Sequence, residues 1–192
     1  MANNQTPEKQ SAFKDLVLPV IVLVVICLVC SALLAVLNDV TAPIIDANTK
    51  AETLAAYLSV LPEGTTDADL TEVTDITTPD VEGAVTTSAG AAAVKAAASG
   101  YSGKDVTVYV AFDMDGTISN ISVDASTQTT GIGSKTGEES FWSGFIGWNA
   151  AEPVSAGNPV DTIAGATVSS NAVITALNSA IDCYNNEIKG VA

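Results

Sequence analysis

The sequence predicts a protein of the α+β class, in which an N-terminal single transmembrane helix precedes one domain built from an antiparallel sheet and flanking helices. Three observations carry this prediction. Residues 16–37 form an uncharged apolar run, residues 105–124 alternate around an Asp-Gly pair, and residues 167–184 repeat apolar side chains with helical spacing. The chain has 192 residues, which leaves room for one globular domain beside the membrane segment.

The apolar run reads LVLPVIVLVVICLVCSALLAVL. A helix over residues 16–37 would span about 33 Å at 1.5 Å per residue, enough to cross the core of a bilayer. The run is too long for the apolar part of a signal peptide, no small-x-small cleavage site follows it, and Val29 before Cys30 does not suit lipidation. We therefore expect a retained anchor in contact with membrane lipid. Cys27 and Cys30 would pack helices within it, with a membrane redox role as the alternative.

The positions of the lysines predict the orientation of this anchor. Lys9 and Lys14 precede the run, and the next lysine is Lys50. Because positively charged flanks stay in the cytoplasm, residues 1–15 are expected to form a cytoplasmic tail, with a short disordered stretch over residues 1–10. The domain after residue 40 is then expected on the extracytoplasmic side.

Residues 38–82 are expected to link the anchor to the domain, which would comprise residues 83–192. The apolar spacing predicts an amphipathic helix over about 44–60, ended by Pro62 and Gly64. The Thr- and Asp-rich residues 64–82 predict a loop or a weakly paired edge. The alanine content of residues 88–98 favours a helix there.

The stretch VAFDMDGTIS poses a choice between two structures. Asp-Gly between alternating runs is typical of a β-hairpin turn, and we predict a hairpin here. The same letters contain D-x-D-G-T, the signature of phosphatases whose first Asp, here Asp113, attacks a phosphoryl group. Such an enzyme needs a parallel doubly wound sheet and a Lys followed by an acidic pair. Only Lys135 and Lys189 follow, without that pair.

The composition excludes several function classes. The chain has 22 Asp and Glu against 7 Lys, no Arg and a net charge of −15, so nucleic acid is not expected as a partner. It has no His, which removes Ser-His-Asp and Cys-His catalysis, the common zinc sites and His-ligated haem. Outside the anchor only Cys183 carries a thiol, too few for an internal disulfide or an iron–sulfur site. No catalytic side chain and no metal site are predicted.

Two segments are candidates for ligand binding. In TTGIGSKTGEESFWSGFIGW, Gly131 and Gly133 predict a flexible loop, and the aromatic residues after it are a weak sign of a planar ligand, with burial in the core as the alternative.

In DTIAGATVSSNAVITALNSAIDCYNN, small residues precede a helix. Its apolar face is expected to comprise Val173, Ile174, Leu177, Ile181 and Tyr184. The N-terminus of this helix would favour an anion, and a plain turn capped by Thr167, Ser169, Ser170 or Asn171 is the alternative.

The run Asp161-x-x-Ala164-Gly165-Ala166-Thr167 resembles the D-x-x-[ST]-G-A-[ST] motif of FMN-binding domains that carry their flavin covalently. Such domains occur in the G subunit of the Rnf complex and in the C subunit of the sodium-pumping NADH:quinone oxidoreductase. The resemblance implies that a dedicated flavin transferase joins FMN to Thr167 through a phosphoester. Gly165 and Ala166 would give the phosphate room, and Asp161 would be needed for the modification. Ala164 departs from the Ser or Thr more usual there.

Further landmarks of the Rnf G subunit follow in the same order: VTAPII, VLPEG, GYSGKDVTVYVAFDMDGTI and TTGIGSK. The family's E-T-P-G-L-G is represented by Gln128-Thr129-Thr130-Gly131-Ile132-Gly133, which lacks the acidic residue and the proline. The resemblance implies an FMN-binding domain over residues 83–192 with covalent FMN. Gly131, Ile132, Gly133 and Trp142 are the expected ring contacts.

The implied function is that of an electron-carrying subunit, without catalysis of its own, of a membrane-bound ion-translocating ferredoxin:NAD⁺ oxidoreductase of the Rnf type. Its partners would be the other membrane and peripheral subunits of that complex. A C subunit of the quinone reductase or another anchored flavin carrier is the alternative within this class. The phosphatase and a non-catalytic anchored module are alternatives from other classes.

Overall fold

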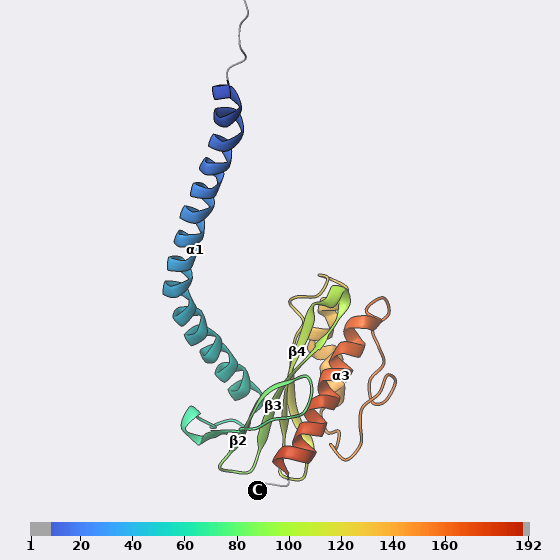
Figure 1. Ribbon diagram of the computed structural model, residues 1–192. Coiled ribbons are helices and arrows are strands. Elements are labelled where there is room, and N and C mark those ends of the chain that lie inside the picture. The colour runs from blue at the N-terminus through green and yellow to red at the C-terminus, as the bar shows by residue number, and fades with distance from the viewer. Residues whose placement is uncertain (1–8, 190–192) are drawn as a thin grey trace, which may run out of the picture. The chain divides into compact units, whose positions relative to one another are not determined.

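The computed structural model describes residues 9–189 and confirms the α+β class, with one long apolar N-terminal helix and an antiparallel sheet with flanking helices (Figure 1). The chain divides after Ala51 into two compact units. The main helices are α1 (Lys9–Val60), α2 (Glu139–Trp142) and α3 (Thr167–Cys183), and a π-helical turn, η5 (Tyr184–Ile188), continues α3. The strands are β1 (Leu70–Glu72), β2 (Val81–Thr87), β3 (Ala92–Ser99), β4 (Asp105–Phe112) and β5 (Ile118–Asp124). Short 3₁₀ turns are η1 (Asp67–Asp69), η2 (Tyr101–Gly103), η3 (Gly133–Gly137) and η4 (Ser143–Phe145).

The predicted anchor lies within α1, which is long and apolar enough to cross a membrane. Its large apolar side chains from Leu16 to Leu37 are mostly exposed. The helix begins at Lys9, so residues 9–15 of the predicted tail are helical, including the last two of the stretch expected to be disordered, whereas residues 1–8 lie outside the described residues. The predicted linker helix is a continuation of α1, which runs through Pro43 to Val60 without a break.

The five strands form one antiparallel sheet in the order β1-β2-β3-β4-β5. Strands β4 and β5 pair as predicted, with Val108 opposite Val123. Their turn contains Gly116 at φ +86°, and the Asp115 carboxylate accepts a hydrogen bond from the Thr117 N–H at 2.9 Å. Within residues 9–189 no parallel strand pair occurs, so Asp113 does not end the parallel strand that the phosphatase alternative requires.

The prediction of a helix over residues 88–98 is wrong, because this alanine-rich stretch is mostly strand β3. Hydrogen bonding to β2 on one side and β4 on the other outweighs the helix propensity of alanine. Ala92 and Ala96 belong to the core that includes residues of α3. The physical reason for alanine here is therefore close packing, since small side chains let a helix approach the sheet.

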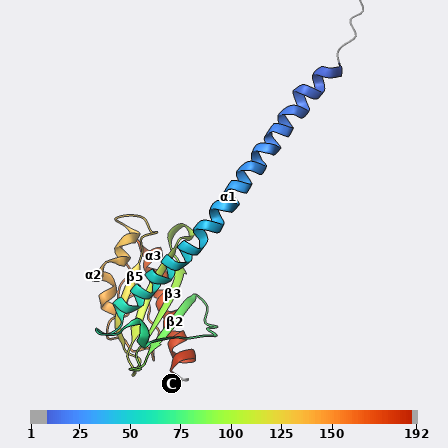
Figure 2. The ribbon, with the colours of Figure 1, turned by 90° about the vertical axis from the view of Figure 1, so that its left-hand side faces the viewer.

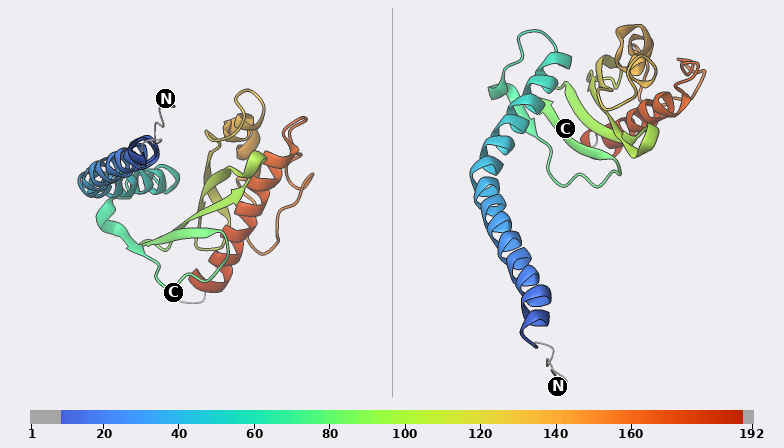
Figure 3. Two further views of the ribbon diagram at one scale, coloured as in Figure 1. Left: turned by 45° about the horizontal axis from the view of Figure 1, so that its top comes forward. Right: turned by 90° about the horizontal axis from the view of Figure 1, so that it is seen from above.

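Helix α3 covers one face of the sheet, as Figures 1 and 3 show. Its predicted apolar face is confirmed, and all five of its members are buried: Val173, Ile174, Leu177, Ile181 and Tyr184.

The end of α1 packs against the opposite face (Figure 2), where Tyr57, Val60 and Leu61 contact a small core that includes Ala93. Tyr57 meets Tyr109 edge to face, with ring centroids 5.6 Å apart.

A carboxylate near the C-terminus ties η5 to the loop between β1 and β2. Oε1 of Glu187 accepts hydrogen bonds from the N–H groups of Thr77 and Thr78, at 2.8 and 2.9 Å, and from both hydroxyls. Desolvation raises the pKa of Glu187, but these hydrogen bonds outweigh it and bring the pKa to about 2. The charged form is therefore favoured in the folded protein.

Replacing Glu187 with Gln is expected to lower the free energy of unfolding by about 1 kcal/mol at pH 7, because the carboxylate is partly exposed. Since the pKa is lowered on folding, this contribution is complete above pH 4.5 and is lost as the pH falls from 4.5 to about 2. Urea unfolding followed by the fluorescence of Trp142 and Trp148, both in this unit, measures it. Glu139→Gln, an exposed site on α2, is the control. A difference between wild type and Glu187→Gln that stays constant down to pH 2 would contradict the assignment.

Candidate functional site: a cavity at the start of helix α3

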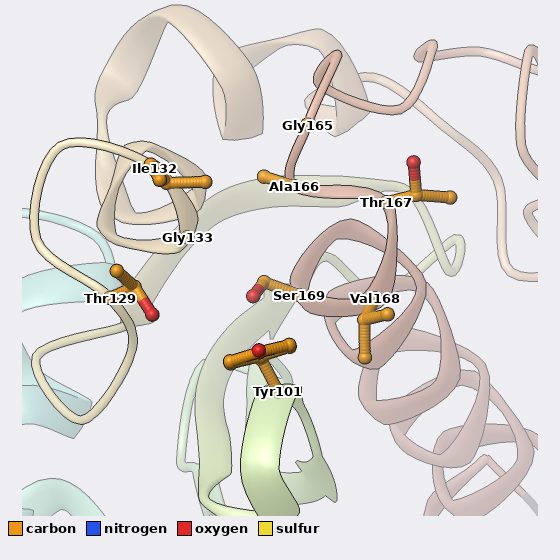
Figure 4. Close-up of a pocket in the computed structure, with 9 residues that line it drawn as sticks. All are labelled: Tyr101, Thr129, Ile132, Gly133, Gly165, Ala166, Thr167, Val168 and Ser169. Atoms are coloured by element: carbon orange, nitrogen blue, oxygen red, sulfur yellow. The ribbon is translucent and has the colours of Figure 1, made fainter.

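A cavity of about 460 Å³ opens where three segments of the domain meet. Its walls are η2, the loop leading into η3, and the first turn of α3. Nine residues line it (Figure 4): Tyr101, Thr129, Ile132, Gly133, Gly165, Ala166, Thr167, Val168 and Ser169. None of them is charged, and the volume falls within the range of small-molecule sites.

The first turn of α3 offers free hydrogen-bond donors to this cavity. Ala166 occupies the N-cap position and supplies no side-chain cap, so the predicted capping by a hydroxyl or amide side chain is wrong. Among the described residues no group accepts from the backbone N–H of Thr167, Val168 or Ser169. These N–H groups and the positive end of the helix dipole favour an anionic group. Gly165 precedes them at φ +81°, a backbone conformation that favours glycine.

Thr167 is exposed at the first position of α3. Its hydroxyl makes no hydrogen bond within the described part of the chain, and in Figure 4 it points away from the body of the helix. The two residues before it, Gly165 and Ala166, are small, so the exposed hydroxyl is accessible from that side.

Three apolar side chains surround the cavity and remain exposed. Tyr101 is 58% exposed, Ile132 50% and Val168 52%. Exposed apolar groups around an uncharged cavity suit a flat, largely apolar ligand. Tyr101 was missed by the sequence reasoning, although its place in the glycine-bounded stretch GYSG was a signal that could have found it.

The floor of the cavity is held by the amide of Gln128, which is 5% exposed. Its Oε1 accepts hydrogen bonds from the Tyr101 N–H at 3.0 Å and from the Ser169 hydroxyl at 2.8 Å. Its Nε2 donates to the Lys104 carbonyl at 2.8 Å and to the Thr127 hydroxyl at 3.1 Å. The Gln128 side chain therefore joins η2 to α3. The sequence analysis noted only that Gln128 stands where the family has an acidic residue.

Gly133 is needed for close packing at this floor. A Cβ atom at this position would lie 2.6 Å from Oγ of Ser169 and 3.0 Å from Cβ of Gln128. The backbone of Gly133 does not have a positive φ, so glycine is required here by contact and not by conformation. Sequence analysis predicted a flexible loop, whereas Gly133 is buried at the start of η3.

The cavity brings together five of the residues singled out from the sequence: Ile132, Gly133, Gly165, Ala166 and Thr167. Two others, Gly131 and Ala164, are exposed neighbours of lining residues in the chain.

Asp161 and Trp142 lie elsewhere. Asp161 lines a second hollow of about 390 Å³, together with Lys135 and Glu138. The Trp142 indole N–H donates to the Gly137 carbonyl at 3.2 Å, and its ring packs against the main core.

The fold and the cavity define an α+β domain with an uncharged cavity of small-molecule size at the start of a helix. Comparison with family models then gives the class of cofactor, since residues 100–182 match the family described as FMN-binding domain. The chain therefore contains an FMN-binding domain, and all nine lining residues fall inside the matched segment. Such a domain indicates a flavin-binding electron carrier. A comparison with curated proteins gives no match.

The residues at the cavity fit FMN on three counts. The exposed apolar groups suit the flavin ring, the free N–H groups of the first turn suit a phosphate, and the small residues before Thr167 leave space for it. When bound, the flavin supplies transfer of one or two electrons, and the protein supplies its position and surroundings.

The packing of Gly133 yields a test. Gly133→Ala is expected to lower the free energy of unfolding by about 1–3 kcal/mol and to reduce flavin content, because the added methyl displaces Ser169 and Gln128. Urea unfolding and the ratio of visible to ultraviolet absorbance of the purified chain measure the two effects. Gly147→Asn is the matched control, since Gly147 does not line the cavity, a Cβ there meets nothing within 4 Å, and Asn tolerates its φ of +87°. Equal stability and flavin content in both variants would contradict the packing role of Gly133.

Proposed function

We propose that this chain is a membrane-anchored electron-transfer flavoprotein whose FMN is joined to Thr167 by a phosphoester. One observation supports this most directly. The hydroxyl of Thr167 is exposed, makes no hydrogen bond within the described residues, and lies beside three free N–H groups at the wall of an uncharged cavity. An esterified phosphate at this oxygen would meet hydrogen-bond donors without any rearrangement of the helix.

The charge distribution agrees with a covalent attachment. Flavin phosphates are commonly held by Arg or Lys, but the chain has no Arg and the cavity lining has no charged side chain. A diester phosphate keeps one negative charge, which the start of a helix stabilises by about 0.3–1 kcal/mol. That contribution is too small to retain a cofactor alone, so a covalent bond would do so.

The remaining lining residues have positioning tasks. Tyr101, Ile132 and Val168 would contact the apolar ring and exclude water from it. The chain has no His, and electron transfer by a bound flavin requires no general acid or base from the protein.

The membrane segment and the wider assembly belong to the same proposal. Residues 16–37 of α1 would cross the membrane, with the N-terminus in the cytoplasm and the FMN-binding domain on the other side. The chain would pass electrons between other cofactors of an Rnf-type ion-translocating oxidoreductase, and a flavin transferase would mature it. The motif around Thr167 and the order of landmarks along the chain support this assignment. A C subunit of the quinone reductase or another flavin carrier would differ in the subunits that co-purify.

The ester linkage is tested by Thr167→Ala. Wild-type chain, produced together with a flavin transferase, is expected to fluoresce under ultraviolet light on a denaturing gel, and the variant is expected to show no signal. Mass spectrometry of the tryptic peptide covering residues 136–189 locates the added flavin phosphate. Thr175→Ala, an exposed threonine on the same helix, is the control and is expected to keep the signal. A fluorescent Thr167→Ala band would contradict the ester linkage at Thr167. A colourless wild type would favour a non-catalytic module.

The orientation is tested by protease added to intact cells, or to spheroplasts where an outer membrane is present. Cleavage is expected after residue 40, because Lys14 directly precedes the apolar run whereas the first lysine after it, Lys50, lies well beyond its end. An epitope tag before Met1 is expected to stay protected. Protection of the domain with cleavage of the tag would reverse the orientation.

A further inference from the structure

The buried amide of Gln128 has only one possible orientation. One of its terminal atoms lies 3.0 Å from the Tyr101 backbone nitrogen, which can only donate, so this atom must be the oxygen. The other lies 2.8 Å from the Lys104 carbonyl oxygen, which can only accept, so it must be the nitrogen. Backbone groups on both sides therefore fix which end of the amide faces Ser169.

This orientation determines what Ser169 can offer a ligand. The amide oxygen of Gln128 can only accept, so the Ser169 hydroxyl donates its single proton across the 2.8 Å contact. Ser169 is 2% exposed and lines the cavity, and in Figure 4 its oxygen points to the side of Thr129. What remains for a ligand is the lone-pair side of Oγ, a hydrogen-bond acceptor.

Because the Ser169 hydroxyl oxygen can only accept a hydrogen bond from a ligand, it determines which part of the ligand can lie beside it. A phosphate needs donors, which Ser169 cannot give, so the phosphate would stay at the free N–H groups of Thr167 and Val168. The partner of Ser169 must itself carry a proton. In FMN the ribityl hydroxyls carry protons, and in the oxidised isoalloxazine ring N3 alone does, because N1 and N5 are unprotonated. The exposed apolar groups of Tyr101 and Ile132, which line the same cavity as Ser169, suit the ring better than the polar ribityl chain.

Resting on the proposed flavin cofactor, we propose that Oγ of Ser169 accepts a hydrogen bond from N3–H of the flavin ring, with Gln128 as the residue that positions this hydroxyl. The pair Gln128–Ser169 thereby acts as a specificity determinant for the pyrimidine edge of the ring. Gln positions Ser169 better than Glu would. An ionised carboxylate would place an oxygen beside the Lys104 carbonyl oxygen, so two acceptors would face each other without a proton between them.

The experiment uses the full-length chain in detergent, produced in a host without a flavin transferase, and titrates it with riboflavin or 3-methylriboflavin. Quenching of flavin fluorescence reports the affinity. Wild type is expected to bind riboflavin about fivefold more tightly than the methylated compound. This ratio corresponds to the net free energy of one hydrogen bond. Ser169→Ala is expected to lose about fivefold in affinity for riboflavin and to bind both compounds equally.

Ser170→Ala is the matched control. Its hydroxyl is also fully buried in the first turn of α3, but it accepts from the Ile163 N–H at 3.1 Å instead of pointing into the cavity. This variant reports the general cost of losing a buried hydroxyl, and its preference for riboflavin is expected to persist.

The positioning role of Gln128 is tested by measuring the preference of Gln128→Glu for riboflavin as a function of pH. A residue with a purely structural role would not make this preference depend on pH. A protonated Glu can donate to the Lys104 carbonyl and accept from Ser169, as the amide does, whereas an ionised one cannot donate. Burial and the carbonyl raise the pKa of such a carboxyl. The preference for riboflavin is therefore expected at low pH and lost as the pH rises, while wild type keeps it throughout.

Equal binding of the two flavins by wild type, or a preference retained in Ser169→Ala, would overturn the N3–H contact. Loss of affinity for both compounds to the same extent in Ser169→Ala would assign the donor to the ribityl chain and overturn it too. If wild type binds neither compound, this inference fails, whereas the covalent flavin assignment is decided separately by the fluorescence of the wild-type and Thr167→Ala bands on the denaturing gel. If the preference is found but Thr167 proves unmodified in native material, the contact stands and only the ester fails.

Discussion

One buried amide sets the geometry on which the cavity depends. Gln128 links the backbone of η2 to the first turn of α3, segments that lie 27 and 41 residues from it in the chain. A buried amide left without partners costs about 1–3 kcal/mol, so all of its hydrogen bonds must form together. Gly100 and Gly133 both leave room for its side chain, since a Cβ on either would lie 3.0 Å or less from a Gln128 atom. The cavity walls are thus held by one satisfied network.

The contrast between an acidic chain and an uncharged cavity has a physical consequence. With a net charge of −15, the chain repels anions in bulk solution, and the cavity lining has no Lys or Arg to oppose this. The local attraction for a phosphate comes from backbone dipoles at the start of α3, which act over about one helical turn. Such a site holds a phosphate that is already attached far better than it captures one from solution. This reasoning makes the exposed hydroxyl of Thr167 the central group of the proposed function.

Helix α3 can serve as this platform because of how closely it packs on the sheet. The strand beneath it, β3, presents Ala92, Ala96 and Ala98 to the shared core, and at the far end Tyr184 stacks on Phe112 with centroids 4.6 Å apart. The first turn, where the cavity lies, is thereby placed by contacts along the whole helix. An alanine-rich segment that favours a helix in isolation becomes a strand, since only small side chains allow this approach.

The sequence alone determined the long apolar helix, the β4–β5 hairpin and the buried face of α3, because each depends on periodicity or turn chemistry within a short stretch. It also singled out Ile132, Gly133, Gly165, Ala166 and Thr167 as candidates, though in two separate segments. Only the tertiary structure decided that these segments share one cavity, that Tyr101 lines it, and that residues 92–99 form a strand. The reason is that hydrogen bonds such as those of Gln128 join residues far apart in the chain, and no local pattern records which partner a buried polar group will meet.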